Sequence, residues 1–237
     1  MPLTSKNKLE AVILAGGRGT RLQSVIADRP KVLAPVAGKP FLHLLLNNLA
    51  RNGFSRVVLS VGYMADQIIQ AVGKTFANME IHYVREAHPL GTGGGLRLAF
   101  QACKNDHVFV MNGDTFLNLD FARAEAFWQD HKDIILVGCK VEDSARYGCL
   151  RIDNNHITAF LEKSLSGPGV INAGCYIALP SSLDSFPPGK AFSFEKDVLQ
   201  PFVAKKPIRL FITDGTFIDI GIPDDYARAQ TVLRDFL

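Results

Sequence analysis

The sequence predicts an α/β fold, with a doubly wound, mostly parallel sheet that carries helices on both faces. Over residues 9–141, short apolar runs typical of buried strands alternate with segments whose apolar residues recur at helical spacing. Glycine-rich loops follow two of these runs, at the strand ends where such sheets bind ligands. After residue 141 the alternation gives way to short β segments, so we expect a mixed sheet whose second half is β-rich.

Composition indicates one globular domain over residues 1–237. The chain is 47% hydrophobic and 21% charged, and its net charge of +3 is too small to indicate nucleic-acid binding but suits phosphorylated substrates. Its four cysteines lack zinc or redox spacing, which favours a reduced, cytoplasmic chain. No apolar run approaches a membrane span and the first eight residues have no signal core, so neither a membrane nor a nucleic-acid partner is expected.

The ordered pattern begins at residues 9–15, LEAVILA, whose length and apolar content favour a buried strand. Residues 16–22, GGRGTRL, follow at once. Their glycines let the backbone approach a ligand without Cβ clashes, and successive N–H groups in such a loop can form a concave phosphate site. Arg18 and Arg21 add forked positive charge. An exposed turn with solvated arginines is the alternative interpretation.

The rest of the first half continues the alternation of strands and helices. After an ordered loop over residues 23–39, we expect a helix over 41–50, a strand over 56–61, a helix over 65–76 and a strand over 80–84. Residues 85–95, REAHPLGTGGG, predict a second flexible loop that opens a helix at about Leu96.

The second half starts with a strand over 108–111, a helix over 121–131 and a strand over 133–141. Residues 153–155, DNN, predict a hairpin between strands at 148–152 and 157–161. Further strands are expected over 170–179, 208–213 and 216–220, and a helix from Pro223 to the C-terminus, with Pro and acids in its first turn.

Two aspartates follow predicted strands. Asp114 comes after the strand at 108–111, and Asp219 lies at the end of the strand at 216–220. Asp is a hard oxygen ligand that suits magnesium, and both residues would lie at the ligand edge of the sheet. A lone aspartate in such a place is more often a turn former or a helix cap.

The glycine loop matches neither common phosphate motif, because a P-loop would need Lys-Ser/Thr directly after Gly19 and a dinucleotide fingerprint would need glycine at Leu22. Residues 14–40 instead resemble the signature of the sugar-1-phosphate nucleotidyltransferases, LAGGxGTRL, seven residues, PK, then PVAGKP. Further segments also resemble that family, and the last of them, DIGIP, has Ile222 where the family usually has Thr. They are LGTGG (90–94), GD (113–114), YG (147–148), FLEK (160–163), NAG (172–174) and DIGIP (219–223).

The resemblance implies a Rossmann-like domain with a nucleotide-binding half at about 9–114 and a β-rich, sugar-phosphate-binding half at about 115–237. Implied nucleotide contacts are Leu14, Ala15, Gly16, Gly17, Arg18, Gly19, Thr20, Glu86, Gly91, Thr92 and Gly93. Implied sugar-phosphate contacts are Asn112, Gly148, Glu162, Lys163 and Asn172. Asp114 and Asp219 would bind Mg2+.

The reaction that the resemblance implies is nucleotidyl transfer, in which a sugar 1-phosphate attacks the α-phosphorus of a nucleoside triphosphate and pyrophosphate leaves. The attacking phosphate is already ionised, so catalysis would depend on positioning and charge neutralisation. In this family Lys31 would neutralise the α-phosphate, Arg21 the pyrophosphate and Lys163 the incoming phosphate.

Glu86, five residues before Gly91, indicates which nucleotide base the enzyme uses. Family members that use UTP or dTTP resemble each other in carrying Gln near this position. A carboxylate only accepts hydrogen bonds, which suits the N1–H and N2–H₂ donors of guanine, so we expect GTP as substrate. A Glu that merely faces solvent is the alternative.

The chain most resembles short guanylyltransferases that act on D-glycero-α-D-manno-heptose 1-phosphate and feed capsule, S-layer or lipopolysaccharide assembly. Longer mannose-1-phosphate guanylyltransferases carry a C-terminal domain that we do not expect here. Alternatives are a mannose-1-phosphate guanylyltransferase, a hexose-1-phosphate uridylyl- or thymidylyltransferase, and a regulatory paralogue without turnover. The charged site residues disfavour the last, and whether the chain forms a homo-oligomer stays open.

Overall fold

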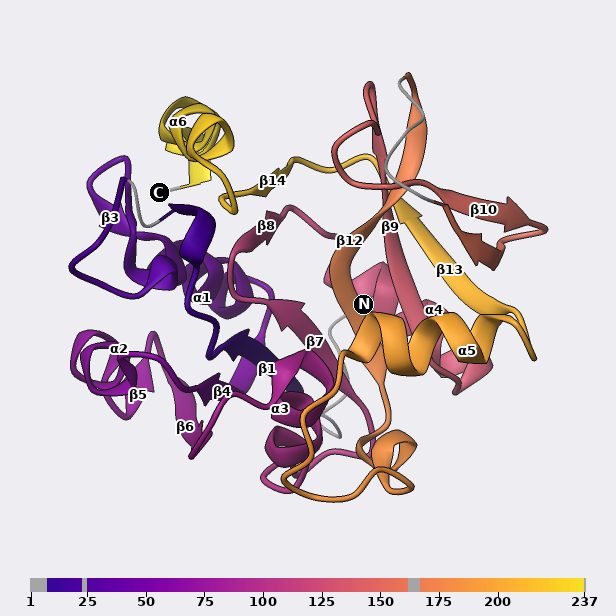
Figure 1. Cartoon of the computed structure of the whole chain (residues 1–237), viewed down its shortest axis with the longest axis horizontal. Helices are drawn as coiled ribbons and strands as arrows, with labels where there is room; N and C mark the ends of the chain where they lie inside the picture. The colour runs from indigo at the N-terminus through magenta and orange to yellow at the C-terminus, as the bar shows by residue number, and fades with distance from the viewer. Residues whose placement is uncertain (1–7, 23–24, 162–166, 237) are drawn as a thin grey trace.

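The computed structural model describes residues 8–22, 25–161 and 167–236. Within these residues ten strands form one sheet in the order β10-β11-β13-β9-β12-β7-β1-β4-β6-β5 (Figure 1). Parallel pairing joins β7 to β1, β1 to β4 and β4 to β6. These strands are β1 (Leu9–Ala15), β4 (Phe54–Val61), β6 (Met79–Arg85) and β7 (Val108–Asn112). This block confirms the predicted α/β sheet.

The second half completes the sheet with strands of both directions. β12 (Gly169–Ala178) runs antiparallel between β7 and β9 (Ile135–Val141), and β13 (Ile208–Thr213) pairs in parallel with β9. The predicted hairpin forms from β10 (Leu150–Asp153) and β11 (His156–Phe160). The mixed character predicted for the sheet is therefore confirmed.

Helices cover both faces of the sheet. Ile13 belongs to one hydrophobic cluster and its neighbour Val12 to another, because side chains alternate along β1. The first cluster includes buried residues of α1 (Phe41–Arg51), α2 (Ala65–Val72), α4 (Phe121–His131) and α6 (Pro223–Val232). The second includes those of α3 (Gly91–Phe100), η3 (Pro180–Leu183), η4 (Phe194–Leu199) and α5 (Gln200–Val203). Burial on both faces explains why the strand sequences are almost continuously apolar.

Helix α2 is shorter than predicted. It ends at Val72, where the Gly73 N–H donates to Ile69 O and Gly73 adopts a φ of 76°. The next residues form β5 (Thr75–Phe76), which pairs antiparallel with β6. The prediction of a helix to residue 76 was wrong because the apolar Phe76 fits helical spacing but follows a glycine that terminates the helix.

Helix α3 begins at Gly91, not at about Leu96, so the glycine-containing part of the predicted loop, residues 91–95, is helical. The reason is a neighbouring segment that packs against the first turns. A Cβ on Gly93 would clash with the Phe192 ring, and one on Gly94 would lie 2.5 Å from Lys190 O. The Gly93 N–H also donates to Phe192 O. These glycines serve close packing rather than flexibility.

Short elements complete the described fold. The predicted loop at 23–39 contains η2 (Lys31–Leu33) and a ribbon of β2 (Pro35–Val36) and β3 (Lys39–Pro40). A second ribbon pairs β8 (Thr115–Leu117) with β14 (Phe217–Asp219). Helix α6 ends at Val232 and is followed by η5 (Arg234–Phe236). Among the described helices, none has the length and hydropathy needed to cross a membrane.

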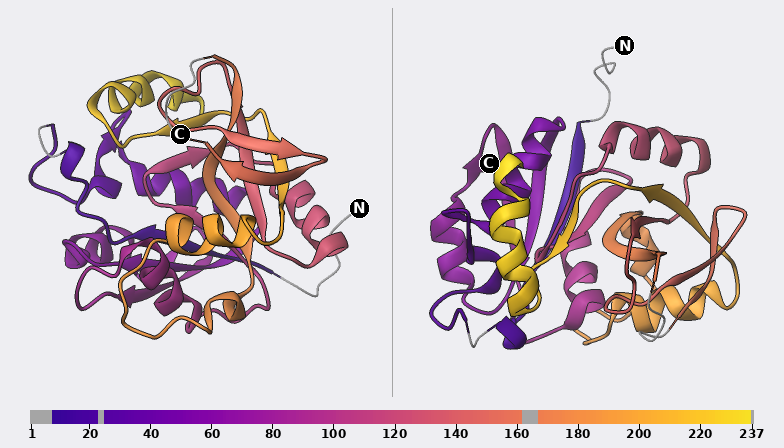
Figure 2. Two further views of the ribbon diagram at one scale, coloured as in Figure 1. Left: turned by 45° about the vertical axis from the view of Figure 1, so that its right-hand side comes forward. Right: turned by 90° about the horizontal axis from the view of Figure 1, so that it is seen from above.

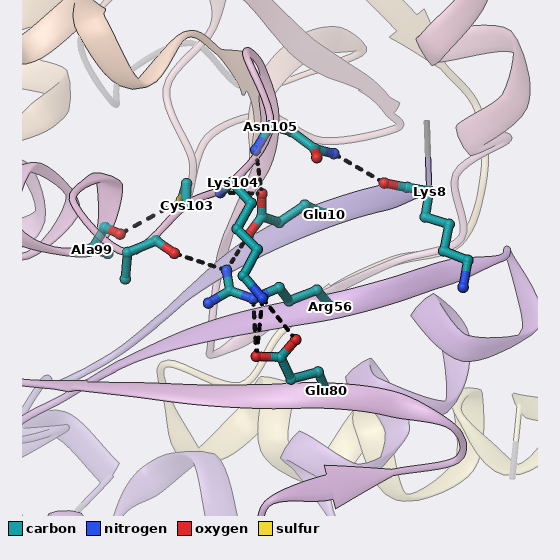
Figure 3. Close-up of polar contacts among 9 residues, drawn as sticks. Lys8, Glu10, Arg56, Glu80, Ala99, Cys103, Lys104 and Asn105 are labelled. Atoms are coloured by element: carbon teal, nitrogen blue, oxygen red, sulfur yellow. Dashed lines mark hydrogen bonds and ion pairs between the residues drawn. The ribbon is translucent and has the colours of Figure 1, made fainter. Parts of the chain in front are cut away.

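A buried ion pair ties the N-terminal end of β1 to its neighbours (Figure 3). Glu10 and Arg56 pair with side chains that are 2% and 8% exposed. The second oxygen of Glu10 accepts from the N–H groups of Lys104 and Asn105, both at 2.9 Å. Arg56 Nη1 donates to Ala102 O at 2.8 Å. The pair therefore fixes the segment after α3 against β1 and β4.

We predict that Glu10→Gln lowers the free energy of unfolding by about 3–5 kcal/mol, because it removes the buried counter-ion of Arg56. The exposed Glu80, 3.4 Å from Arg56 Nε, would replace little of that interaction. Urea unfolding followed by circular dichroism measures the change. The control is Glu80→Gln, since Glu80 is 52% exposed and its pairs with Arg56 and Lys104 are solvated; we expect less than about 1 kcal/mol. Equal losses in both variants would contradict this account.

Candidate active site

A cavity of about 560 Å³ lies where β1, β4, β6 and β7 end, at one edge of the sheet. We call it the edge cavity. Its lining comes from five segments that are far apart in the sequence: residues 14–19, 31–32, 62–63, 86–92 without Leu90, and Asn112 with Asp114. Its volume suits a small organic ligand such as a nucleotide.

The glycine loop folds over the side chain of Lys31. Gly19 has a φ of 61°, and a Cβ at that position would lie 2.8 Å from Lys31 Cβ. Only glycine fits both requirements, so the close contact with Lys31 explains the glycine at this position of the loop. Thr20 and Arg21 start η1 (Thr20–Leu22); both are exposed and lie outside the lining of the edge cavity.

Lys31 and Asp114 form an ion pair inside the edge cavity. Lys31 Nζ lies 2.5 Å from Asp114 Oδ2, with side chains that are 10% and 33% exposed. The Gly113 N–H donates to Leu14 O at 2.9 Å and so extends the pairing of β7 with β1. This hydrogen bond sets Asp114 directly beside the glycine loop.

Asp219 reaches the same place from the other half of the chain. It ends β14, where it pairs with Thr115 of β8, and the next N–H, that of Ile220, donates to Asp114 O at 2.9 Å. Its Oδ1 accepts from the Gly221 N–H at 2.6 Å. The two aspartates predicted as ligands are thus brought together, although Asp219 is not part of the lining of the edge cavity.

The two carboxylates repel each other. The pKa of Asp219 is raised from 3.8 to about 6, first by burial and then by the charge of Asp114, while Lys31 opposes both effects. A divalent cation would relieve this repulsion. Among the described residues, no group of three or more acidic, His or Cys side chains is placed to hold a metal ion, so two carboxylates would leave positions for phosphate oxygens and water. That donor set fits magnesium, which commonly takes one or two carboxylates together with substrate phosphates.

Glu86 lines the edge cavity but also holds the chain around it. Its Oε2 accepts from the Leu90 N–H at 2.9 Å, and its Oε1 accepts from Ser60 Oγ at 3.3 Å. A Cβ on Gly16 would lie 2.5 Å from Oε1, so the carboxylate rests against the glycine loop. Gly91 and Thr92 also line the cavity, whereas Gly93 is buried under Phe192.

The predicted sugar side lies around β12. Asn112 lines the edge cavity and packs against Gly174, where a Cβ would lie 2.5 Å from its Nδ2. Asn172 lies two residues earlier on β12, outside the lining. Gly148 follows Tyr147, whose ring packs edge-on against Phe217 of β14, at 5.3 Å. Glu162 and Lys163 lie outside the described residues.

Helix α6 connects the two sides of the site. Tyr226 Oη and Gln230 Nε2 donate to Pro35 O, and Gln230 Oε1 accepts from the Ala37 N–H. In the other direction, the buried carboxylate of Asp225 pairs with Arg146, next to Tyr147. The helix therefore lies against N-terminal segments although it comes late in the chain (Figure 2).

Two residues of this region, Asp225 and Glu195, were not predicted from the sequence as part of the site. Asp225 follows Pro223 and was interpreted only as an acid in the first turn of a helix. Glu195 lies outside every helix and strand predicted from the sequence. Its contact with Asn172 depends on the tertiary structure. The segment at 192–199, FSFEKDVL, carries three charged residues, so nothing in the sequence singles out Glu195.

The sequence matches the model of the nucleotidyl transferase family over residues 10–235. The chain belongs to the nucleotidyl transferase family. It is 37% identical to D-glycero-alpha-D-manno-heptose 1-phosphate guanylyltransferase from Aneurinibacillus thermoaerophilus, over 97% of this chain and 100% of that protein. It is 34% identical to mannose-1-phosphate guanylyltransferase from Mycobacterium tuberculosis, over 96% of this chain and 65% of that protein.

A solved structure agrees in fold. HddC from Yersinia pseudotuberculosis, complexed with GMP-PN, superposes with a TM-score of 0.84 at 41% identity, covering 94% of this chain and 98% of that chain. This nucleotidyl transferase is therefore an enzyme, as the resemblance predicted, and its family typically uses a divalent metal. Neither comparison assigns roles to individual side chains, so the site residues stay predictions.

We predict that Asp219→Asn stabilises the metal-free protein at pH 8 by about 1–3 kcal/mol while removing most transferase activity. The pKa of Asp219 is raised on folding, so its ionisation lowers stability as the pH rises through 6, and the amide removes that charge while it can still accept from the Gly221 N–H. The gain should shrink as the pH falls from 6 to 4. Urea unfolding in EDTA at several pH values measures it.

The matched control is Asp130→Asn, an exposed aspartate on α4. It should change neither activity nor the pH dependence of stability. An Asp219→Asn variant that is less stable than the parent at pH 8 would contradict the repulsion between Asp114 and Asp219.

Proposed function

We propose that this enzyme condenses GTP with D-glycero-α-D-manno-heptose 1-phosphate to give the GDP-sugar and pyrophosphate. The observation that carries the proposal is the edge cavity, in which the glycine loop and Lys31 meet Asp114, with Asp219 next to Asp114 outside the lining. The heptose guanylyltransferase from Aneurinibacillus thermoaerophilus, matched over its full length, supports the choice of nucleotide and sugar. HddC complexed with GMP-PN supports a guanine nucleotide in this cavity.

The reaction forms one bond and breaks one. An oxygen of the sugar phosphate attacks the α-phosphorus of GTP, and the bond to the β-phosphate breaks to release pyrophosphate. No side chain needs to remove a proton, because the attacking oxygen is already ionised. The protein supplies positioning and charge: the N–H groups of the glycine loop hold the phosphates, and Lys31 neutralises the α-phosphate.

Asp114 and Asp219 would hold Mg2+ between the two substrates. When bound, Mg2+ supplies charge neutralisation and orientation at the reacting phosphates. Because Lys31 already pairs with Asp114, arrival of the nucleotide lets Lys31 exchange a carboxylate partner for a phosphate partner. From the family resemblance, we further propose that Arg21 neutralises the leaving pyrophosphate and that Lys163 holds the sugar phosphate.

Glu86 is proposed to read the base. Each of its oxygens accepts only one hydrogen bond among the described residues, so lone pairs remain for guanine N1–H and N2–H₂. Uracil or thymine would place a carbonyl against a carboxylate oxygen and leave both groups unpaired.

A mannose-1-phosphate guanylyltransferase is the second candidate, favoured by the 34% identity to the Mycobacterium tuberculosis protein. A nucleotide-activated heptose suits transfer into capsule, S-layer or lipopolysaccharide. We place the enzyme in the cytoplasm, an assignment that its four unpaired cysteines support.

The test is a panel of GTP, UTP, dTTP and CTP against the 1-phosphates of heptose, mannose and glucose, read by pyrophosphate release. We expect the highest kcat/KM for GTP with heptose 1-phosphate, and a preference for GTP over UTP of at least about tenfold. Preference for UTP or dTTP would contradict the guanylyl assignment, and preference for mannose 1-phosphate would replace the sugar.

The variant Glu86→Gln should narrow the GTP-to-UTP ratio of kcat/KM by about tenfold, because the amide provides a donor for a pyrimidine carbonyl. Its remaining oxygen can still accept from the Leu90 N–H, so the loop should keep its position. Glu80→Gln, at the other end of β6, is the control and should leave the ratio unchanged. An unchanged ratio in Glu86→Gln would remove Glu86 as the base-reading residue.

A further inference from the structure

The amide of Asn172 is almost fully used inside the protein. Its Nδ2 donates to Tyr176 Oη and to Glu195 Oε2, both at 2.8 Å, and its Oδ1 accepts from the Gly174 N–H at 3.0 Å. An amide can donate two hydrogen bonds and accept two, so only one acceptor position remains. Asn172 therefore has no hydrogen left to donate to a sugar hydroxyl.

Glu195 has the opposite balance. It is half-buried, and its Oε2 accepts from Asn172. Within the described part of the chain, no hydrogen bond engages its Oε1. An ionised carboxylate offers about four acceptor positions, so most of those on Glu195 are unused. The hydrogen bond from Asn172 fixes the orientation of the carboxylate.

Glu195 is also not needed to hold its own turn. It lies in η4, a single π-helical turn, whose start is capped by Ser193 Oγ accepting from the Lys196 N–H at 3.1 Å. Asp197 Oδ2 in turn accepts from the Ser193 N–H at 2.7 Å. Single π-helical turns occur frequently at functional sites.

Short chains of contacts link Glu195 to two residues that line the edge cavity, Thr92 and Asn112. The preceding N–H, that of Phe194, donates to Thr92 Oγ1 at 3.0 Å, and Thr92 lines the cavity. On the other side, Asn172 is two residues from Gly174, which packs against the cavity-lining Asn112. Glu195 thus lies on the side of the cavity that faces the second half of the chain.

We propose that Glu195 binds a hydroxyl group of the acceptor sugar and that Asn172 and Tyr176 act as positioning residues which aim its carboxylate. The inference rests on the proposed function. It gives to Glu195 a contact with the sugar 1-phosphate, a substrate that the family resemblance expected Asn172 to contact. A hydroxyl that donates to an ionised carboxylate forms a charge-assisted hydrogen bond, which selects sugars bearing that hydroxyl in the right place.

The experiment measures KM for heptose 1-phosphate and Kd for GTP in the wild type, Glu195→Ala, Glu195→Gln and Asp197→Asn. We expect Glu195→Ala to raise KM for heptose 1-phosphate about 10- to 100-fold and Glu195→Gln at least about threefold, with Kd for GTP unchanged. Asp197→Asn, on the same turn, should lower thermal stability without changing KM. This control separates sugar contact from support of the turn.

The inference is overturned if Glu195→Ala keeps KM within twofold of the wild type, or if Kd for GTP changes by the same factor as KM. If Glu195→Ala does not fold, Glu195→Gln decides, since its oxygen can still accept from Asn172. A wild type that uses neither heptose nor mannose 1-phosphate would overturn the proposed function and this inference together. A wild type that uses heptose 1-phosphate, with Glu195 variants of unchanged KM, would overturn this inference and leave the proposed function standing.

Discussion

The carboxylates of Asp114 and Asp219 are held close together at the end of the sheet, and much of the structure serves to tolerate their repulsion. The ribbon of β8 and β14 fixes them, anchored by the fully buried Phe116 and Ile218. The Ile220 N–H closes the ribbon onto Asp114 O, and Lys31 supplies one compensating charge. A triphosphate would add further negative charge, and the proposed cation would reduce its repulsion by the carboxylates.

The same arrangement couples the two halves of the chain. One aspartate follows β7 in the parallel block and the other ends β14, which the chain reaches only after completing the mixed sheet. Helix α6 begins at Pro223, four residues after Asp219, contacts Pro35 and pairs with Arg146. In the proposed function these contacts would link α6 to both substrates.

The sequence predicts the central sheet well because its parallel strands are buried on both faces and read as apolar runs. It fails where tertiary contact decides the local structure. The glycines at 91–95 look like a flexible loop until Phe192 and Lys190 are seen packed against them. The short helices between residues 180 and 203 have no periodicity long enough to detect. The meeting of Asp114 with Asp219 came from the family resemblance, since residue spacing cannot show it.

The most direct test of the account is the affinity of Mn2+, a spectroscopic substitute for Mg2+, measured by electron paramagnetic resonance in the presence of GTP. The wild type should bind one Mn2+ per chain, and Asp114→Asn and Asp219→Asn should each weaken that binding at least about tenfold. Affinity for GTP without metal should be unchanged or tighter in both variants, because each removes a negative charge. Unaltered Mn2+ affinity in both variants would contradict the paired carboxylates as the metal site.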